Sequence, residues 1–266
     1  FKILDTMMAA HISANAVSTV AYLSQINMAI SALGGGLAVG ASIKISEAYG
    51  EGNFELVKRR VSTLFALCGL LGMAILAILI PVAPQFLRLA NTPEEFIEEG
   101  TVYFILELVS LVIIFFNNVY IAIERARGNS KRILNLNMMV IGIKLSLTAF
   151  FVYVLKGGIN YISIATIVSQ LALLGVAVFY MNAKENVFGF SWKAISFRKL
   201  VVAPMIKLSV PVIVEKMAFS LGKVVVNSMS TVYGTLTVGA LGISNNIGGI
   251  TTNPQNGFQE GASAII

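Results

Sequence analysis

Several ionisable side chains stand inside long apolar stretches of this sequence, where a charge is costly. On insertion scales, a charged residue at the centre of a membrane-spanning helix costs about 2.5 to 3.5 kcal/mol, and such residues mark ion or substrate pathways and proton relays. An opposite charge, a change of protonation state or access to water relieves that cost. The candidates for such chemistry are Asp5, Glu107, Lys144, Glu215, Lys216, Lys223 and Glu260.

Lys144 is the most deeply placed of these residues. It is the only charged residue between Met138 and Leu155. It stands about nine residues from the turn near Gly128 and about twelve from Lys156, which puts it well inside a hydrocarbon layer of roughly 30 Å. Thr148 follows one turn later on the same helix face. A carboxylate partner, a deprotonated amine or a water-filled cavity would relieve the cost of this ammonium group.

Glu215 is placed similarly, about ten residues into the helix expected from Met205. Its neighbour Lys216 points about 100° away, so the two do not form a pair on that helix. An interhelical ion pair with only structural value is the alternative for this region. Glu107 lies about three turns from the expected outer edge, where snorkelling, a hydrated cavity and a dedicated role all fit.

Uncharged polar residues within the apolar stretches fit a hydrated interior. They could line a substrate cavity together with Glu215, Lys216 and Glu260, and each one alone also suits an interhelical hydrogen bond. The glycines at 34–36 and Gly40 are interpreted as close-packing or bending positions, because no Lys–Ser/Thr of a phosphate loop follows them. The polar candidates for the cavity are Gln25, Asn117 and Gln170.

Enzymatic chemistry finds no support in the sequence. It contains no nucleophile–His–acid set, no HExxH and no carboxylates paired at a catalytic spacing. The single cysteine, Cys68, excludes a disulfide framework, and the single histidine, His11, is interpreted as structural or solvated. We therefore expect a protein that is not an enzyme and that holds no cofactor and no metal.

Composition explains why charges are so rare in these stretches. Hydrophobic residues make up 56% of the 266 residues and charged residues 12%, and the mean hydropathy is +0.82. Soluble domains keep about a quarter of their residues charged. Long runs without a charge approach or exceed the roughly 20 residues of a membrane-spanning helix: Thr6–Ile43, Val61–Leu87, Leu108–Ile123, Gly157–Ala183 and Val224–Gln259. The sequence predicts an all-α polytopic membrane protein.

Charge clusters and turn residues divide the chain into about eight helical segments. The first is the end of a helix, and we expect the chain to be part of a longer protein, since it begins inside an apolar segment and not at a methionine. The expected segments end near Ala10 for the first and cover Ala14–Tyr49, Val57–Leu89, Phe96–Arg127, Lys131–Leu155, Tyr161–Ala183, Met205–Tyr233 and Leu236 onward.

The basic residues lie mostly on alternate loops. They cluster around residues 58–60, 125–132 and 184–207, while an intervening loop carries the acidic run Glu94–Glu99. Lys and Arg in short loops favour the cytoplasmic side. We therefore expect a multi-pass protein of the cell membrane with its basic loops in the cytoplasm, and this topology explains the net charge of +6 better than nucleic-acid binding does.

The longest connection, residues 186–204, places aromatic side chains among basic ones. Such a segment suits the headgroup region of a bilayer, and a solvated loop is the alternative. It is also the expected boundary between two parts of the chain. We predict an N-terminal lobe over residues 1–185, a cytoplasmic interfacial linker over 186–204, and the start of a C-terminal lobe over 205–266.

An internal repeat supports this division. Gly36–Ile45 and Gly257–Ile266 share the pattern G-x-x-x-G-A-S, and Ile3–Ile26 aligns with Val225–Ile247, which sets Asp5 opposite Asn227. A repeat that restarts after six helices indicates two similar bundles, a common transporter plan with the site at the bundle interface. If the second bundle is complete in the parent protein, four helices follow Ile266.

Five stretches, in order along the whole chain, resemble the multidrug and toxic compound extrusion (MATE) transporters. The first resembles the Asp-Thr signature of the family's first helix, the second is similar to the glycine-rich end of its second helix, and the last resembles its seventh. The resemblance implies two lobes of six helices, of which about eight helices are present here. The stretches are Leu4–Ala21, Gly40–Asn53, Phe86–Phe104, Glu124–Met138 and Lys207–Met229.

The resemblance also implies an activity. MATE transporters export small amphipathic, often cationic compounds by alternating access, driven by inward flow of H⁺ or Na⁺, which implies partners limited to such substrates and the lipid bilayer. We expect a monomer with no nucleic-acid partner. A flippase for a lipid-linked saccharide or lipid precursor shares this helix plan and is the alternative. Glu215 would contribute to the substrate or cation site of the second lobe.

The resemblance assigns roles to individual residues. Asp5 matches the family's first-helix aspartate, which binds the cation or proton, and Thr166 matches a threonine near it. Where many members carry Asn and Asp four residues apart in the fifth helix, this sequence has Lys144 and Thr148. We hypothesise that Lys144 faces Asp5, that its ammonium replaces the coupling cation, and that a proton or substrate breaks the pair. A permanent ion pair that only fixes packing is the alternative.

Overall fold

The computed structural model describes residues 2–89, 92–183, 186–234, 236–245, 247–249 and 258, and its described elements are all helical. A π-helical turn, η1 (Phe150–Val154), continues α6, and two short 3₁₀ helices are η2 (Trp192–Ala194) and η3 (Ser230–Tyr233). Residues 236–245 and 247–249 are also helical. The α-helices are α1 (Lys2–Ala9), α2 (Ala14–Gly50), α3 (Phe54–Leu79), α4 (Ala83–Leu89), α5 (Glu94–Ala126), α6 (Ser130–Ala149), α7 (Ile159–Met181) and α8 (Lys199–Met229).

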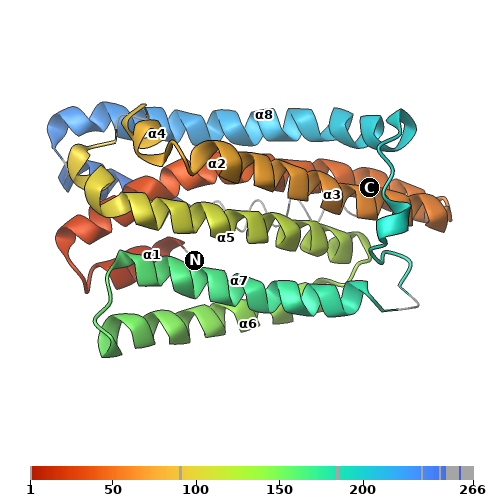
Figure 1. The fold of residues 1–266 in the computed structure, drawn as a ribbon, viewed down its shortest axis with the longest axis horizontal. Helices are drawn as coiled ribbons and strands as arrows, with labels where there is room; N and C mark the ends of the chain where they lie inside the picture. The colour runs from red at the N-terminus through yellow and green to blue at the C-terminus, as the bar shows by residue number, and fades with distance from the viewer. Residues whose placement is uncertain are drawn as a thin grey trace.

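The long helices run side by side, with the connections at the two ends of the bundle (Figure 1). Helix α2 lies at the centre, because it packs against α1, α3, α5 and α8. Helices α6 and α7 form one edge and contact α5, while α8 forms the opposite edge. This arrangement brings α1, α6 and α7 together, since α1 contacts both of the other two.

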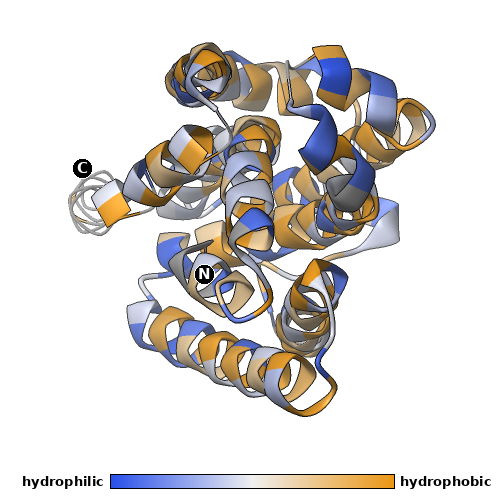
Figure 2. Cartoon of the chain, turned by 90° about the vertical axis from the view of Figure 1, so that its left-hand side faces the viewer, coloured by the Kyte–Doolittle hydropathy of each residue, from blue (hydrophilic) through white to orange (hydrophobic). Residues whose placement is uncertain are grey.

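The outward faces of the helices are apolar as well as the interior (Figure 2). Met73 on α3, Met138 on α6 and Phe179 on α7 are each more than half exposed. A soluble monomer rarely exposes contiguous apolar surface on this scale. Five described helical stretches are long and apolar enough to cross a membrane: Asn15–Gly50, Phe54–Leu79, Gly100–Ala126, Ser130–Val154 and Ile159–Met181. The fold is the polytopic helical membrane bundle that the sequence predicts.

Two predicted helix boundaries are wrong, and both involve proline. The segment expected over Val57–Leu89 is two helices, because Pro81 lacks the N–H that a continuing helix needs and its ring clashes with the preceding turn. Helix α8 begins at Lys199, six residues before the expected Met205. Pro204 lies inside α8, since prolines are tolerated in helices of membrane bundles, so the linker without helix is shorter than expected.

Helix α2 approaches α8 closely through glycines. A Cβ on Gly36 would lie 2.9 Å from the Cα of Ile213, and one on Gly40 would collide with the backbone of Ser209. The Ser209 hydroxyl donates a hydrogen bond to the carbonyl oxygen of Leu37 at 3.2 Å. Small residues allow this approach where lipid supplies no hydrophobic drive between helices. The interpretation of these glycines as packing positions is confirmed.

The connection between α7 and α8 is docked on the end of α3. The Ser191 backbone N–H donates to the Ser62 hydroxyl and the Ser196 N–H donates to Thr63 Oγ1, both at 3.0 Å. Phe188 is buried, whereas Trp192 is 80% exposed. The connection is therefore held against α3 by its backbone, while the indole of Trp192 is exposed.

Candidate functional site

A buried ion pair joins α1 to α6. Lys144 Nζ lies 2.7 Å from Asp5 Oδ1 and 2.8 Å from Asp5 Oδ2. Asp5 is 1% exposed and Lys144 is 2% exposed. The carboxylate that Lys144 was expected to face is thus present, and it comes from the helix that the resemblance indicates.

Asp5 and Lys144 neutralise each other where α1 and α6 meet. Both carboxylate oxygens contact the same ammonium group, and the hydrogen bond that Lys144 donates to Oδ2 is charge-assisted and therefore strong. Removing charges from water costs several kcal/mol per ion, so each member depends on the other to offset that cost. Loss of either charge would leave the other ion uncompensated inside the membrane. A proton on Asp5 is one such loss, because it removes the attraction that holds the Lys144 ammonium.

The two threonines assigned to this region are buried near the same helix junction. Thr148 lies one turn beyond Lys144 on α6 and is 2% exposed, and its Oγ1 has no hydrogen-bond partner among the described residues. Thr166 on α7 is 7% exposed and donates its hydroxyl to the Ile162 carbonyl at 3.1 Å. Thr148 therefore has an unused hydroxyl close to the pair along its helix, and Thr166 bonds within its own helix.

A second carboxylate, Glu107, lies in the interior between α2, α5 and α7. It is 3% exposed. Asn27 Nδ2 donates to its Oε2 at 3.1 Å, and Ser163 Oγ donates to its Oε1 at 3.0 Å. Snorkelling, one of the readings that the sequence left open, is therefore wrong. Asn27 and Ser163 are 80 and 56 residues from Glu107 along the chain, so no spacing rule could have joined them.

Tyr103 is a buried side chain close enough to interact with both carboxylates. It lies about one turn before Glu107 on α5, is fully buried, and interacts electrostatically with both Glu107 and Asp5. Its hydroxyl is also within reach of Ser24 and Ser163. We call these side chains the buried polar core, and its members are Asp5, Lys144, Tyr103, Glu107, Asn27 and Ser163.

The uncharged cavity candidates lie in helix contacts. Asn117 on α5 donates through Nδ2 to the Gln170 side-chain oxygen at 2.7 Å and to the Gln170 carbonyl at 3.0 Å, which joins α5 to α7. Gln25 on α2 is 2% exposed. Of the two alternatives, cavity lining and an interhelical hydrogen bond, Asn117 and Gln170 thus form the hydrogen bond.

The candidates on α8 lie apart from the buried polar core. Glu215 and Lys216 are both exposed. Lys223 is half-buried and sits over the Phe219 ring, with its Nζ 4.7 Å from the ring centroid. Glu260 lies outside the described residues. The structure therefore brings Asp5 and Lys144 together but does not join the α8 residues to them.

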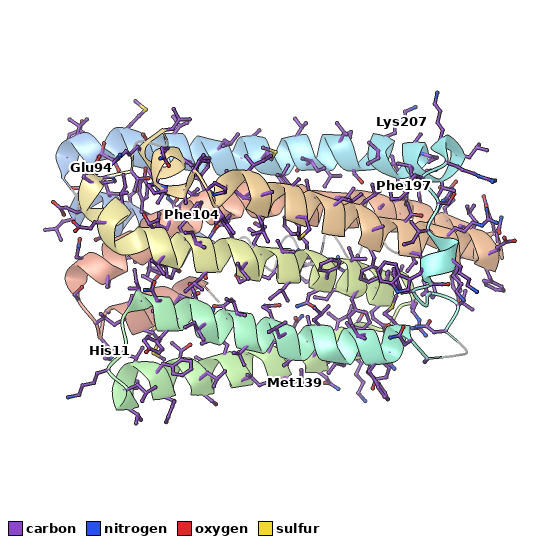
Figure 3. The ribbon with its side chains drawn as sticks, viewed as in Figure 1. His11, Glu94, Phe104, Met139, Phe197 and Lys207 are labelled. Atoms are coloured by element: carbon purple, nitrogen blue, oxygen red, sulfur yellow. The ribbon has the colours of Figure 1, made fainter. Side chains whose placement is uncertain are left out.

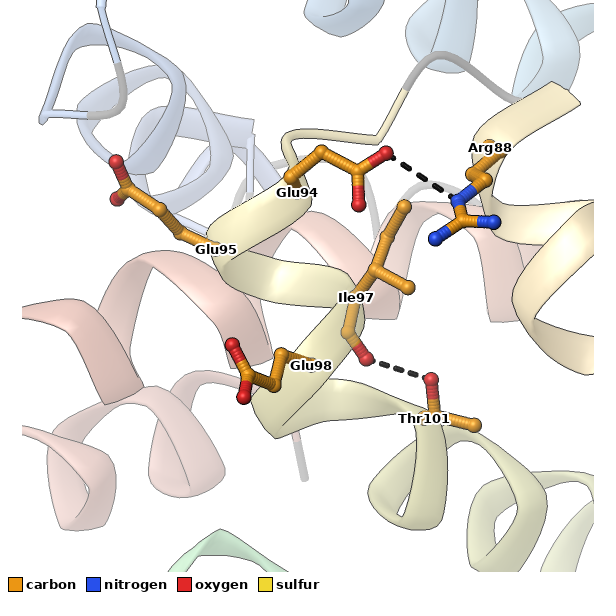
Figure 4. A pocket seen from close by; sticks show the side chains of 6 residues that line it. All are labelled: Arg88, Glu94, Glu95, Ile97, Glu98 and Thr101. Carbon is orange, nitrogen blue, oxygen red and sulfur yellow. Dashed lines mark hydrogen bonds and ion pairs between the residues drawn. The ribbon is translucent and has the colours of Figure 1, made fainter.

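Two of the surface hollows formed by the described residues lie near α4. One, about 520 Å³ in volume, is lined almost entirely by apolar side chains of α2, α3, α4 and α8, including Ile30, Phe86 and Leu221, and its size suits a small-molecule ligand. The other, about 490 Å³, lies beside α4 and the start of α5. There Arg88 pairs with Glu94 at 3.2 Å while both remain mostly exposed (Figure 4), and exposed pairs contribute little.

The two ends of the bundle differ in charge. Glu94 and His11 lie at one end, and Phe197 and Lys207 lie at the other (Figure 3). At the basic end, the turn between α5 and α6 is fixed by Glu124, whose carboxylate is fully buried. It accepts hydrogen bonds at 3.0, 3.3 and 3.0 Å from Arg127, Arg132 and Asn129. The acidic loop and the basic loops that alternate along the sequence thus lie at opposite ends of the bundle.

Two curated proteins of Bacillus subtilis (strain 168) are similar to this chain in sequence. It is 25% identical over 226 residues to "Probable multidrug resistance protein YoeA", which covers 82% of this chain and 49% of that protein. It is 26% identical over 174 residues to "Probable multidrug resistance protein YpnP", which covers 63% of this chain and 37% of that protein. The chain thus spans about half or less of the length of these relatives.

Solved structures share the fold. An inward-facing multidrug resistance MATE transporter of the MOP superfamily matches with a TM-score of 0.85 at 21% identity, over 92% of this chain and 56% of that one. An outward-facing structure matches with a TM-score of 0.84 at 21% identity, over 98% and 57%. MATE proteins are integral membrane transporters with helical spans, and they are not enzymes. The MatE family model matches residues 1–150, more than half of the sequence, and the chain belongs to the MATE family.

Proposed function

We propose that the protein exports small amphipathic, often cationic compounds across the cell membrane and that inward flow of H⁺ or Na⁺ drives the export. The buried ion pair between Asp5 and Lys144 carries this proposal, because it places a carboxylate with a displaceable cation inside a MATE fold. The multidrug resistance named for the relatives supports the substrate class. The apolar hollow against α2 and α8 supports it too, since an amphipathic substrate needs such a surface.

The pair supplies a switch that one proton can operate. Proton binding converts the Asp5 carboxylate to a neutral acid, which removes the attraction that holds the Lys144 ammonium. The freed ammonium then needs water or another polar partner, and the unused Thr148 hydroxyl lies one turn away. A membrane potential of 100 mV supplies about 2.3 kcal/mol per charge moved, which is a useful driving force for export.

In this scheme Lys144 stands in for a coupling cation at Asp5. A Na⁺ ion would have to displace the ammonium to reach the carboxylate, whereas a proton needs only one oxygen lone pair. We therefore favour H⁺ as the coupling ion. We assign Thr148 and Thr166 to the coupling region. The candidates that we propose for the substrate path remain Gln25, Asn117, Gln170, Glu215, Lys216 and Glu260.

A flippase for a lipid-linked saccharide is not proposed. An anionic headgroup needs several Lys or Arg side chains in the cavity that receives it. The Lys144 ammonium is engaged by Asp5, and the hollow between α2 and α8 is lined by apolar residues. The resistance named for the relatives also points to export of foreign compounds.

The test is drug accumulation in whole cells that express the complete protein, with and without a Na⁺ gradient and with a collapsed proton gradient. We expect low accumulation that depends on the proton gradient. Lys144→Ala should lose this dependence while the protein still reaches the membrane, and Lys58→Ala, which removes an exposed lysine, should behave like the wild type. Unchanged ion dependence in Lys144→Ala would refute the coupling role.

A further inference from the structure

A second ionisable site lies beside the proposed coupling pair, and nothing in the family resemblance assigns a role to it. The Glu107 carboxylate is buried between three helices and is held by an amide of α2 and a hydroxyl of α7. Asn27 and Ser163 are neutral donors, whereas Asp5 touches an ammonium group directly. Inside a membrane bundle a carboxylate is costly in its charged form unless its surroundings neutralise it.

The surroundings of Glu107 fit its neutral form as well. A protonated carboxyl group is a hydrogen-bond donor and needs an acceptor. Asn27 is 3% exposed, and its Oδ1 is buried with no hydrogen-bond partner among the described residues. A buried polar atom without a partner costs about 1 to 3 kcal/mol, so its presence asks for an explanation.

Rotation of one amide group would let Asn27 bond to either form of the Glu107 carboxyl group. In the structure, Asn27 Nδ2 donates to Glu107 Oε2, which suits the ionised carboxylate. If Oε2 takes up a proton and the amide turns by half a revolution, Asn27 Oδ1 accepts the new O–H. Ser163 continues to donate to Oε1 in both states. The same three side chains therefore satisfy the carboxylate and the carboxylic acid in turn.

The charged and titratable groups near this site are few. Asp5 on α1 and Lys144 on α6 form the adjacent pair, and Tyr103 on α5 interacts with both carboxylates. Helix α7 contains no Asp, Glu, Lys, Arg or His. Tyr22 on α2 packs against Phe96. The remaining charges of the helices packed on α5 stand toward the ends of those helices: Lys44, Glu47, Glu55, Lys58, Arg59, Arg60, Arg88, Lys131 and Arg132.

We infer that Glu107 is a reversible proton-binding site, with Asn27 as the partner that follows its protonation state. This inference deepens the proposed function, because it gives the N-terminal part of the transporter two carboxylates that can accept a proton. Asp5 contacts the Lys144 ammonium directly, whereas Asn27 and Ser163, which donate hydrogen bonds to Glu107, are uncharged. Tyr103 interacts electrostatically with both carboxylates.

Infrared difference spectroscopy of the complete purified protein in lipid, recorded as the pH is lowered, tests this inference without transport. Protonation of Glu107 should produce a carbonyl stretching band of a buried carboxylic acid. Glu107→Gln should remove that band, while Asp5→Asn should keep it. Asn27→Ala should shift the band, because the acid loses its hydrogen-bond acceptor. Glu98→Gln, an exposed carboxylate on the same helix, is the matched control and should leave the band unchanged.

The two proposals can fail separately. A band that survives Glu107→Gln, or the absence of any such band in the wild type, would overturn the inference about Glu107. If Glu107→Gln removed the band and Lys144→Ala kept its ion dependence, the inference about Glu107 would hold. The coupling role of the ion pair would then be refuted. Glutamine preserves the shape of Glu107 and can still bond to Asn27 and Ser163, and a wild-type thermal unfolding profile would show that the variant is folded.

Discussion

The ammonium of Lys144 contacts both carboxylate oxygens of Asp5, at 2.7 and 2.8 Å, although the two residues are 139 positions apart in the chain. The contact ties α1 to α6 at the edge of the bundle, and both charges are buried. Because each charge is neutralised by the other, the pair is at once a structural link and a position that a proton can open.

The first prediction concerns the stability of this pair. Lys144→Met should destabilise the protein by about 3 to 5 kcal/mol, since it leaves the Asp5 carboxylate buried and uncompensated. The double variant Asp5→Asn with Lys144→Met should recover much of that loss, because no charge remains. Thermal unfolding of the purified proteins in detergent measures both, and equal losses in the single and double variants would show that the ion pair is not intact.

The second prediction concerns the contact of α2 with α8. Gly40→Val should separate the two helices, because a side chain at this position meets the backbone of Ser209. Gly50→Val is the control, since a Cβ at Gly50 meets nothing within 4 Å. Disulfide trapping of a cysteine pair placed across α2 and α8 should become slower only in Gly40→Val. Equal trapping in both variants would contradict the close contact.

The third prediction concerns the turn between α5 and α6. Glu124→Ala should free Arg127, Asn129 and Arg132 from their shared acceptor, and hydrogen bonds to a buried charge are worth about 1.5 to 3 kcal/mol each. The variant should unfold at lower temperature, and trypsin should cleave after Arg127 more rapidly. Glu55→Ala removes only an exposed helical pair with Arg59 and should change neither property.

The fourth prediction concerns orientation in the membrane. The two ends of the bundle differ in charge, and Lys and Arg in short loops favour the cytoplasm. In a protein whose buried Cys68 has been replaced by alanine, a cysteine at Glu98 should react with an impermeant maleimide on intact cells. A cysteine at Lys131 should react only after the cells are permeabilised. The reverse pattern would place the basic loops outside.

The fifth prediction concerns the connection between α7 and α8. Trp192 is largely exposed, next to Lys193, on a segment whose backbone is bonded to Ser62 and Thr63. We expect the indole to lie among lipid headgroups, since Trp is enriched there. In a protein that keeps Trp192 as its single tryptophan, the indole fluorescence should be quenched by brominated lipids in reconstituted vesicles. If a water-soluble quencher reduced the fluorescence and brominated lipids did not, the indole would lie in water.

The helical membrane architecture could be predicted because apolar runs of sufficient length leave a chain few alternatives in lipid. Most helix boundaries followed to within a few residues from charges and turn residues. The start at Ala14 is one, where the Ser13 side chain accepts the backbone N–H of Ala16. The errors lay at Pro81 and Pro204. Pro81 follows the end of one helix, whereas Pro204 lies inside another, so the presence of a proline alone does not predict where a helix ends.

The sequence by itself determined which charges needed a partner. The burial cost of Lys144 follows from its depth in an apolar run, and the resemblance to MATE proteins indicated Asp5 as the acceptor. Only the tertiary structure decided that Asn27 and Ser163 hold Glu107. It also decided that Tyr103 interacts with both carboxylates and that Glu215 and Lys216 are exposed. The physical reason is that hydrophobic periodicity tells which face of a helix is buried, whereas the packing of distant helices determines which polar atoms meet there.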